Sequence, residues 1–162
     1  MGAQRDNLEL IKVNIISENK YHCKNIGKGV YTKARSSILK SGQLKTIVVR
    51  EVFYGHYEII KGNRTFSILK EEGYESVYCF NVGDVDDNEA KLIYLQLSNE
   101  LEVNYVKISQ IINDIFASFP LIDIERVVPY TKNELIELKK VLDFNWEKYK
   151  KVKHDVNQQK LF

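Results

Sequence analysis

The residue types best suited to chemistry lie in a tight turn, Gly62-Asn63-Arg64, directly before a predicted helix. Gly62 permits a backbone turn that a side chain would block. A helix start presents unpaired N–H groups and a partial positive charge, and the forked guanidinium of Arg64 adds a full charge there. The pattern therefore predicts a site for an anion such as phosphate. Thr65 could add a hydroxyl contact to that anion, although such a hydroxyl also commonly stabilises a helix start.

Two β-rich runs at 48–52 and 57–60 lead into this turn, and Tyr54-Gly55-His56 between them supplies a hairpin turn. The helix that follows the glycine turn is expected at 64–72, with Phe66, Ile68 and Leu69 buried, and it stops at Gly73. A strand at 77–82 comes next. The predicted order of this part is therefore β-β-α-β.

Upstream of the turn, alternation predicts a first strand at 11–16, followed by a loop at 20–29 that is rich in Lys, Asn and Gly. Helical spacing begins near Thr32 and continues to Ser41-Gly42, where a glycine typically ends a helix. One face of this helix should be buried: Ala34, Ile38 and Leu39.

Downstream, the acids Asp86, Asp87 and Glu89 begin a helix that should run to about Asn99, because negative charge complements the helix dipole there. Its predicted apolar stripe is Ala90, Leu92, Ile93 and Leu97. A further helix at 107–119 ends at Pro120. Its predicted buried residues are Ile108, Ile111, Ile112 and Ile115.

The stretch at 42–66 resembles the ParB/sulfiredoxin superfamily, in which a G-x-x-x-P-I-V-V-R strand is followed by Y-E-I-I-x-G-x-R-R. Thr46 stands in place of the proline of the first motif, and Thr65 replaces the second arginine of the second motif. Leu97-Ser98-Asn99 resembles the I-E-N-L segment of the family, with Ser98 in place of the glutamate. The likeness covers roughly residues 11–109. It implies an α+β fold, a small mixed sheet flanked by helices.

The resemblance also implies that Gly62, Asn63, Arg64 and Thr65 line a nucleoside triphosphate site, with CTP or ATP as the candidate ligand. The amide of Asn99 would help to hold the nucleotide or its metal ion. The alternatives are a helix C-cap for Asn99, an ordinary turn for Gly62 and a surface ion pair with Glu71 or Glu75 for Arg64. Ser98 lacks the carboxylate that would help to hold Mg²⁺ in CTP-binding relatives, so the need for Mg²⁺ and the occurrence of hydrolysis stay open.

No protein metal site is predicted, because the adjacent pair His22-Cys23 has no second pair of ligands. Sulfiredoxin activity is not expected, since it requires a reactive cysteine in the phosphate loop, where Asn63 and Arg64 stand. Cys79 lies in a strand run and should be part of the core. Asp84, Asp86 and Asp87 are clustered as a nuclease would require, but they fit a loop before a helix.

The charge distribution is uneven. Residues 12–50 contain nine basic residues and one acidic residue, a net charge of +8, whereas residues 51–130 contain six basic and fourteen acidic residues, a net charge of −8. A basic block attracts polyanions, although it can also be only a solvated surface. The candidate DNA contacts are Lys20, Lys24, Lys28, Lys33 and Arg35. No base-reading module is evident, so binding is expected to be independent of DNA sequence.

Three parts are predicted along the 162 residues: a ParB/sulfiredoxin-like domain at 1–119, a C-terminal helical appendix at 120–146 and a flexible tail at 147–162. The appendix has capping-box spacing from Thr131 to Glu134, followed by an apolar stripe of Leu135, Leu138, Val141, Leu142 and Trp146. Residues 127–149 resemble the C-terminal stretch of single-domain ParB-like proteins of phages and mobile elements. The stripe must be covered by the domain or by a partner protein.

The ordinary composition, the absence of a long apolar run and the polar first ten residues predict a soluble, cytoplasmic protein with reduced thiols and no membrane contact. The leading hypothesis is a nucleotide-binding ParB-like domain that acts in DNA partition, maintenance or regulation of a mobile element. Two alternatives stay open: a non-enzymatic adaptor with a decayed pocket that binds a DNA-modifying partner, and a small nuclease or kinase that uses the same pocket. Enzymatic activity, such as weak NTP hydrolysis, is undecided, as are the recognised base and the oligomeric state.

Overall fold

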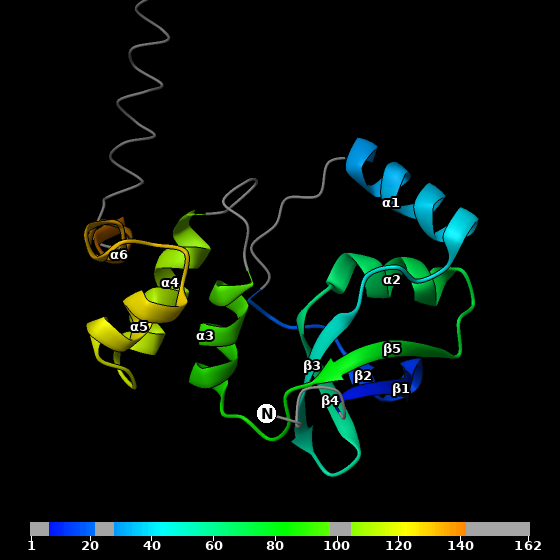
Figure 1. Cartoon of the computed structure of the whole chain (residues 1–162), viewed down its shortest axis with the longest axis horizontal. Coiled ribbons are helices and arrows are strands. Elements are labelled where there is room, and N and C mark those ends of the chain that lie inside the picture. Colours follow the sequence, from blue (N-terminus) through cyan, green and yellow to red (C-terminus); the bar gives the residue numbers. More distant parts are fainter. Residues whose placement is uncertain (1–6, 22–27, 98–104, 142–162) are drawn as a thin grey trace, which may run out of the picture.

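The computed structural model describes residues 7–21, 28–97 and 105–141. Five strands form one mixed sheet in the order β1-β5-β3-β4-β2. The central strands β3 and β4 are the predicted hairpin, β3 pairs with β5 in parallel, and the two short N-terminal strands occupy the edges. Figure 1 shows the sheet beside the helices that lie within residues 87–140, with the helices at 28–41 and 63–71 above it. The strands are β1 Leu8–Lys12, β2 Ile16–Ser17, β3 Ile47–Phe53, β4 His56–Lys61 and β5 Ser76–Asn81.

The prediction of a single first strand at 11–16 is wrong. The chain forms β1, a short 3₁₀ helix η1 (Val13–Ile15) and then β2. β1 pairs antiparallel with β5 at one edge, whereas β2 pairs parallel with β4 at the opposite edge. Because neighbouring strands lie about 4.8 Å apart, one straight strand cannot serve both edges of this sheet. The chain must therefore turn, and the N–H of Val13 donates to the carbonyl of Glu75 at 2.9 Å where it does so.

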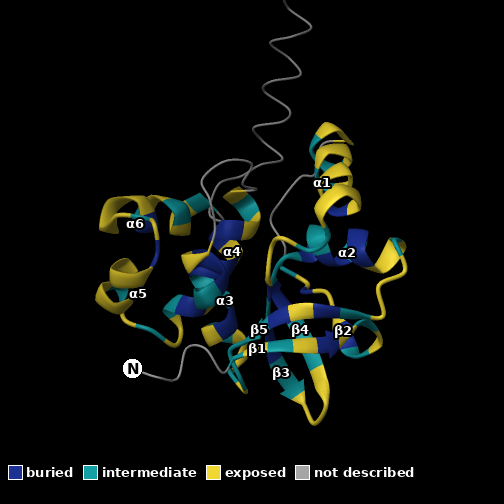
Figure 2. Cartoon of the chain, turned by 45° about the vertical axis from the view of Figure 1, so that its right-hand side comes forward, coloured by how far each residue is buried: buried dark blue, intermediate teal, exposed yellow. Residues whose placement is uncertain are grey.

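One face of the sheet is covered by α2 (Asn63–Glu71), and α1 (Lys28–Ser41) packs against α2. The predicted core residues Phe66, Ile68 and Leu69 are all buried there, together with Ile38 and Cys79. α1 begins before Thr32, and the expectation that Leu39 is buried is wrong, since this side chain is 61% exposed. α1 lies over α2 at the outside of the molecule, so only a narrow stripe of α1 reaches the core (Figure 2).

The second core lies among the helices α3 (Asp87–Gln96), α4 (Tyr105–Phe116), α5 (Leu121–Val127) and α6 (Lys132–Lys140). All four predicted isoleucines of α4 are buried. The apolar stripe predicted for α3 is partly wrong, because Tyr94 and Leu95 are buried while Leu97 is exposed. α3 packs against both α4 and β4, and Ile60 of β4 belongs to the same core. Because two elements cover α3, its buried face differs from the predicted stripe and includes Tyr94 and Leu95.

The helix predicted at 107–119 ends at Phe116, and Pro120 instead precedes the short helix α5. The capping box at the start of α6 is confirmed, since Thr131 and Glu134 each bond the backbone N–H of the other. Ile124 and Leu135 are fully buried in the same core as α3 and α4. The C-terminal helices therefore pack against the rest of the chain as far as they are described, whereas Leu142, Trp146 and residues 147–162 lie outside the described part. None of the described helices has the length and apolar character needed to cross a membrane.

Candidate functional site

The glycine turn and the helix start lie where the sequence predicted them. Gly62 has a φ of 116°, in the left-handed region that favours glycine. A Cβ at this position would lie 3.3 Å from both the Cα and the Cγ1 of Ile47. The backbone of β3 and the turn are thus in close contact, and two independent constraints, conformation and space, require glycine here.

The first turn of α2 offers backbone donors. The N–H of Phe66 donates to the carbonyl of Gly62 at 2.9 Å, so the N–H groups of Asn63, Arg64 and Thr65 precede the helical ladder. Gly62 has no side chain that could cap them. Three backbone donors and the positive end of the helix dipole therefore meet at this turn, an arrangement that favours a bound anion.

Two side chains of this turn carry buried polar atoms without a partner. Asn63 is 7% exposed, and its Oδ1 has no hydrogen bond, and neither does the Nε of Arg64. A buried polar group without a partner costs roughly 1–3 kcal/mol, so a ligand that supplied the partner would recover that energy. A half-turn of the Asn63 amide exchanges its oxygen and nitrogen, so this side chain can present an acceptor or a donor.

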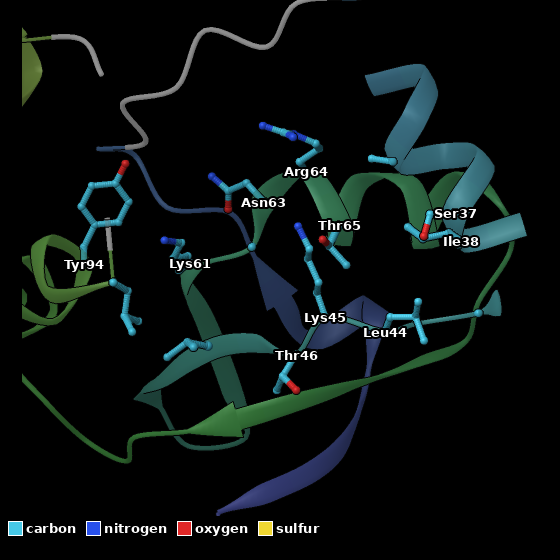
Figure 3. A pocket seen from close by; sticks show the side chains of 15 residues that line it. Ser37, Ile38, Leu44, Lys45, Thr46, Lys61, Asn63, Arg64, Thr65 and Tyr94 are labelled. Atoms are coloured by element: carbon cyan, nitrogen blue, oxygen red, sulfur yellow. The ribbon is translucent and has the colours of Figure 1, made fainter. Parts of the chain in front are cut away.

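These residues line a cavity of about 450 Å³ between the start of α2, α1, the loop at 42–46 and the end of α3. Three cationic side chains line it, those of Lys45, Lys61 and Arg64, and no carboxylate does so within the described part of the chain. In Figure 3, Lys45 points toward the start of α2, and Asn63 and Arg64 extend from the first turn of that helix. Counted over the described residues, the polar end of the cavity therefore has a net positive charge and suits a polyanion.

The rest of the cavity is mostly apolar. Its walls include Ile38 of α1, Leu44 of the following loop and Tyr94 of α3. A pocket with an apolar wall and a few convergent polar groups is typical of a small-molecule site. A ligand that joins an anionic end to a flat, less polar body would fit both parts of this pocket.

A polar cluster around Arg50 connects α3, the helix that supplies Tyr94 to the pocket, with the sheet. Arg50, which is 6% exposed, donates to Glu58 of β4 at 2.9 Å and to Asp87 at the start of α3 at 2.5 Å. The hydrogen bond from Arg50, together with its positive charge, keeps the pKa of the Asp87 carboxyl below its ordinary value. Tyr21 packs edge-on against Tyr94 with 5.4 Å between ring centroids, and burial, with a smaller effect of the Glu58 charge, raises the pKa of its hydroxyl.

Asn19 fixes the loop that leads to Tyr21. Its Nδ2 donates to the carbonyl of Ile60 at 2.8 Å, two residues before the glycine turn, and the side chain is buried. The loop after β2 is thereby attached to the end of β4, which positions the turn of Gly62.

The surface ion pair considered for Arg64 is not found. Glu71 accepts a hydrogen bond from Tyr31 instead, and within residues 7–21, 28–97 and 105–141 no carboxylate lies within ion-pair distance of Arg64. Asn99, the remaining predicted nucleotide contact, lies outside the described residues, as do Ser98 and its neighbours. The described residues contain no group of three His, Cys, Asp or Glu that could hold a metal ion.

The predicted DNA contacts that the structure describes lie on two segments, α1 and the loop after β2. Lys28, Lys33 and Arg35 are exposed on α1, and Lys20 is exposed on the loop after β2. Lys24 lies outside the described residues. The charge of Arg35 is already paired with Glu72 at 2.7 Å, and the charge of Arg50 is buried. Residues 12–50 therefore offer DNA less exposed, unpaired positive charge than their number of basic residues suggests.

Lys45, Lys61 and Tyr94 also line the pocket, although they are not among the site residues predicted from the sequence. Lys45 lies inside the first recognised motif, but at a position that the motif leaves free. Lys61 immediately precedes Gly62, so its position in the sequence could have indicated that it lies at the site. No local sequence pattern indicates Tyr94 as a pocket residue, because its position depends on how α3 packs against other elements.

Comparison with known proteins places the chain in a family. No curated protein sequence matches it. The structure of C-terminally truncated ParB from Caulobacter crescentus in complex with the centromeric parS site matches with a TM-score of 0.59 and 14% identity, covering 88% of this chain and 75% of that chain. The pNOB8-like ParB-N domain matches with a TM-score of 0.54 and 12% identity, covering 84% of this chain and 61% of that one. The Caulobacter protein in complex with CTP-γ-S matches with a TM-score of 0.47 and 15% identity, covering 86% and 81%.

At these identities the two matches with TM-scores of 0.59 and 0.54 show the fold alone, which is the predicted α+β arrangement. The sequence profile described as ParB N-terminal domain matches residues 2–100, more than half of the chain. The chain therefore belongs to the ParB N-terminal domain family.

Proposed function

We propose that this chain is a ParB-like domain that binds a nucleoside triphosphate in the pocket in front of α2 and acts with DNA in the partition, maintenance or regulation of a mobile element. The observation that carries the proposal is the convergence of Lys45, Lys61 and Arg64 with the unpaired N–H groups of a helix start, in a pocket whose described lining contains no carboxylate. The triphosphate occupies the cationic end, and the apolar walls cover the base and ribose. CTP and ATP are the candidate nucleotides.

Calorimetric titration with CTP, ATP and GTP, each with and without Mg²⁺, tests this proposal directly. At least one triphosphate should bind, and Arg64→Ala should weaken its binding by about 1.5–3 kcal/mol, the range for hydrogen bonds to charged groups. Arg126→Ala is the matched control, because Arg126 is 70% exposed on α5 and does not line the pocket. Absence of binding by every triphosphate would favour an adaptor with a decayed pocket instead.

A crystallographic test does not depend on the base. Crystals grown with sulfate or phosphate should show an anion at Gly62–Thr65, because backbone donors and Arg64 converge there. An empty turn with Arg64 directed into solvent would argue against the site.

The proposed contacts to DNA lie on α1. Lys28 and Lys33 are exposed on it, and neither makes an ion pair with a described residue. Binding to phosphates should be independent of sequence and sensitive to salt, with a log-log slope near −2.7 if about three phosphates are neutralised.

The test is the affinity for duplexes of unrelated sequence between about 50 and 200 mM salt. The double variant Lys28→Ala/Lys33→Ala should reduce the slope by about 1.8. Lys132→Ala/Lys140→Ala on α6 removes the same charge elsewhere and should change it little. Binding confined to one sequence would contradict a phosphate-only contact.

A further inference from the structure

Lys45 reaches the pocket from a different segment than the glycine turn. It lies on the loop between α1 and β3, whereas Asn63, Arg64 and Thr65 belong to the first turn of α2. Figure 3 shows its side chain directed toward that turn, on the side of Thr65. No carboxylate of the described residues lies within ion-pair distance of Lys45, so its charge is available to a ligand.

The backbone of Lys45 is held by the side chain of Gln43. The Nε2 of Gln43 donates to the carbonyl of Lys45 at 2.9 Å and to the carbonyl of Tyr78 at 2.8 Å, while its Oε1 accepts from the N–H of Tyr78 at 2.8 Å. The amide thus pairs with β5 at two points, as a neighbouring strand would. Two residues after Lys45, the backbone of Ile47 lies against Gly62. The loop is therefore fixed to the sheet on one side and to the glycine turn on the other.

We propose that Lys45 is a further phosphate-binding residue, that Gln43 is a positioning residue for it, and that the two make this pocket select nucleotides with several phosphates over monophosphates. This inference rests on the proposed nucleotide site. One phosphate at the start of α2 is served by the backbone N–H groups and Arg64. A cation from a separate segment engages a different part of the phosphate chain, and an ammonium group contacts it as a point charge without demanding a fixed geometry.

The proposed selectivity follows from this division: a single phosphate is held by the N–H groups and Arg64, and the ammonium group of Lys45 contacts the next phosphate of a longer chain. Loss of the Lys45 charge should then weaken triphosphate binding strongly and monophosphate binding little. Gln43 does not line the pocket. Its removal should act only by letting Lys45 move.

The experiment is a set of calorimetric titrations of the full chain with CTP, CDP and CMP, and with ATP, ADP and AMP as a second series. Lys45→Gln should reduce triphosphate affinity about tenfold or more, the effect of losing a charge-assisted contact, and change monophosphate affinity less than about twofold. Lys45→Arg should retain most of the affinity. Lys70→Gln is the matched control, because Lys70 is exposed at the far end of α2 and does not line the pocket.

The role of Gln43 is tested by a double-mutant cycle. Gln43→Ala should lower the ratio of triphosphate to monophosphate affinity in the natural chain, and it should have no further effect on that ratio in a Lys45→Gln background. A purely structural role of Gln43 would persist in both backgrounds and would overturn the positioning assignment.

The outcomes separate the two proposals. If the natural chain binds no nucleotide, the proposed function fails and this inference fails with it. If the natural chain binds triphosphates and Lys45→Gln behaves like Lys70→Gln throughout both series, the proposed nucleotide site is supported and the role assigned to Lys45 is wrong.

Discussion

The guanidinium of Arg50 on β3 lies 2.5 Å from the carboxylate of Asp87 in the first turn of α3. The same guanidinium bonds Glu58 on β4 and the carbonyl of Val85 at 3.1 Å. One buried side chain thereby joins the sheet to the helix that supplies Tyr94 to the pocket. The position of that pocket wall depends on an ion pair as well as on apolar packing.

Removal of Arg50 should be far more costly than removal of Asp87. Arg50→Met leaves Glu58, whose side chain is 18% exposed, without its cation, and the expected loss of unfolding free energy is about 3 kcal/mol or more. Asp87→Asn should cost about 1 kcal/mol, because its side chain is 78% exposed. Urea unfolding measures both, with Asp84→Asn in the preceding exposed loop as the control. Equal losses for the two variants would contradict the assigned burial.

The contribution of Asp87 should disappear in acid. Its pKa is lowered in the folded state from an ordinary value of 3.8, first by the hydrogen bond from Arg50. Stability from this group is therefore present above the ordinary value and is lost as the pH falls through the lowered value. The difference in unfolding free energy between the natural chain and Asp87→Asn should shrink as the pH falls below the ordinary pKa of 3.8 and vanish once the pH is well below the lowered pKa. A difference that is constant with pH would exclude an electrostatic origin.

Gly62→Ala should destabilise the protein and damage the anion site. The left-handed backbone costs about 1–2 kcal/mol for alanine, and the new Cβ at 3.3 Å from Ile47 adds a steric cost. Thermal unfolding gives the loss, and calorimetry gives nucleotide affinity. Gly29→Ala in α1 is the control, since it has open space and should be neutral or stabilising by up to about 1 kcal/mol. An equally stable Gly62→Ala chain would mean that the turn relaxes freely.

The C-terminal helices should contribute to the stability of the whole chain. Leu135→Ala should cost about 2–5 kcal/mol, because this side chain is fully buried in the core shared with α3 and α4. Leu39→Ala, the same change at an exposed site, should cost little. Removal of residues 129–162 should lower the melting temperature by more than Leu135→Ala does. If the shortened chain melts like the full one, the tail is better explained as a partner-binding segment.

Cys79 should be inert while the protein is folded. The side chain is fully buried, and burial raises the pKa of its thiol to about 12, so little thiolate is present near neutral pH. In a Cys23→Ser chain, a thiol reagent should label this residue only in denaturant, as mass spectrometry would show. Rapid labelling of the native chain would reveal local opening of β5.

Features that depend on neighbouring residues could be predicted from the sequence. The hairpin, the left-handed glycine before α2, the buried face of α2 and the capping box of α6 all follow from backbone preferences and short-range hydrogen bonds. The resemblance to a known family supplied the fold and the sheet-to-helix order, because its motifs span these same local elements.

Features that depend on contacts between distant segments were decided by the tertiary structure. The first strand divides between two sheet edges because β4 and β5 offer separate unpaired edges, and α3 buries Tyr94 because it packs on β4 and α4 together. Lys45 and Arg64 line one cavity only because β3 lies against the glycine turn. Periodicity within a segment records which face is apolar, but it cannot record which distant segment will cover that face or place a second cation beside the first.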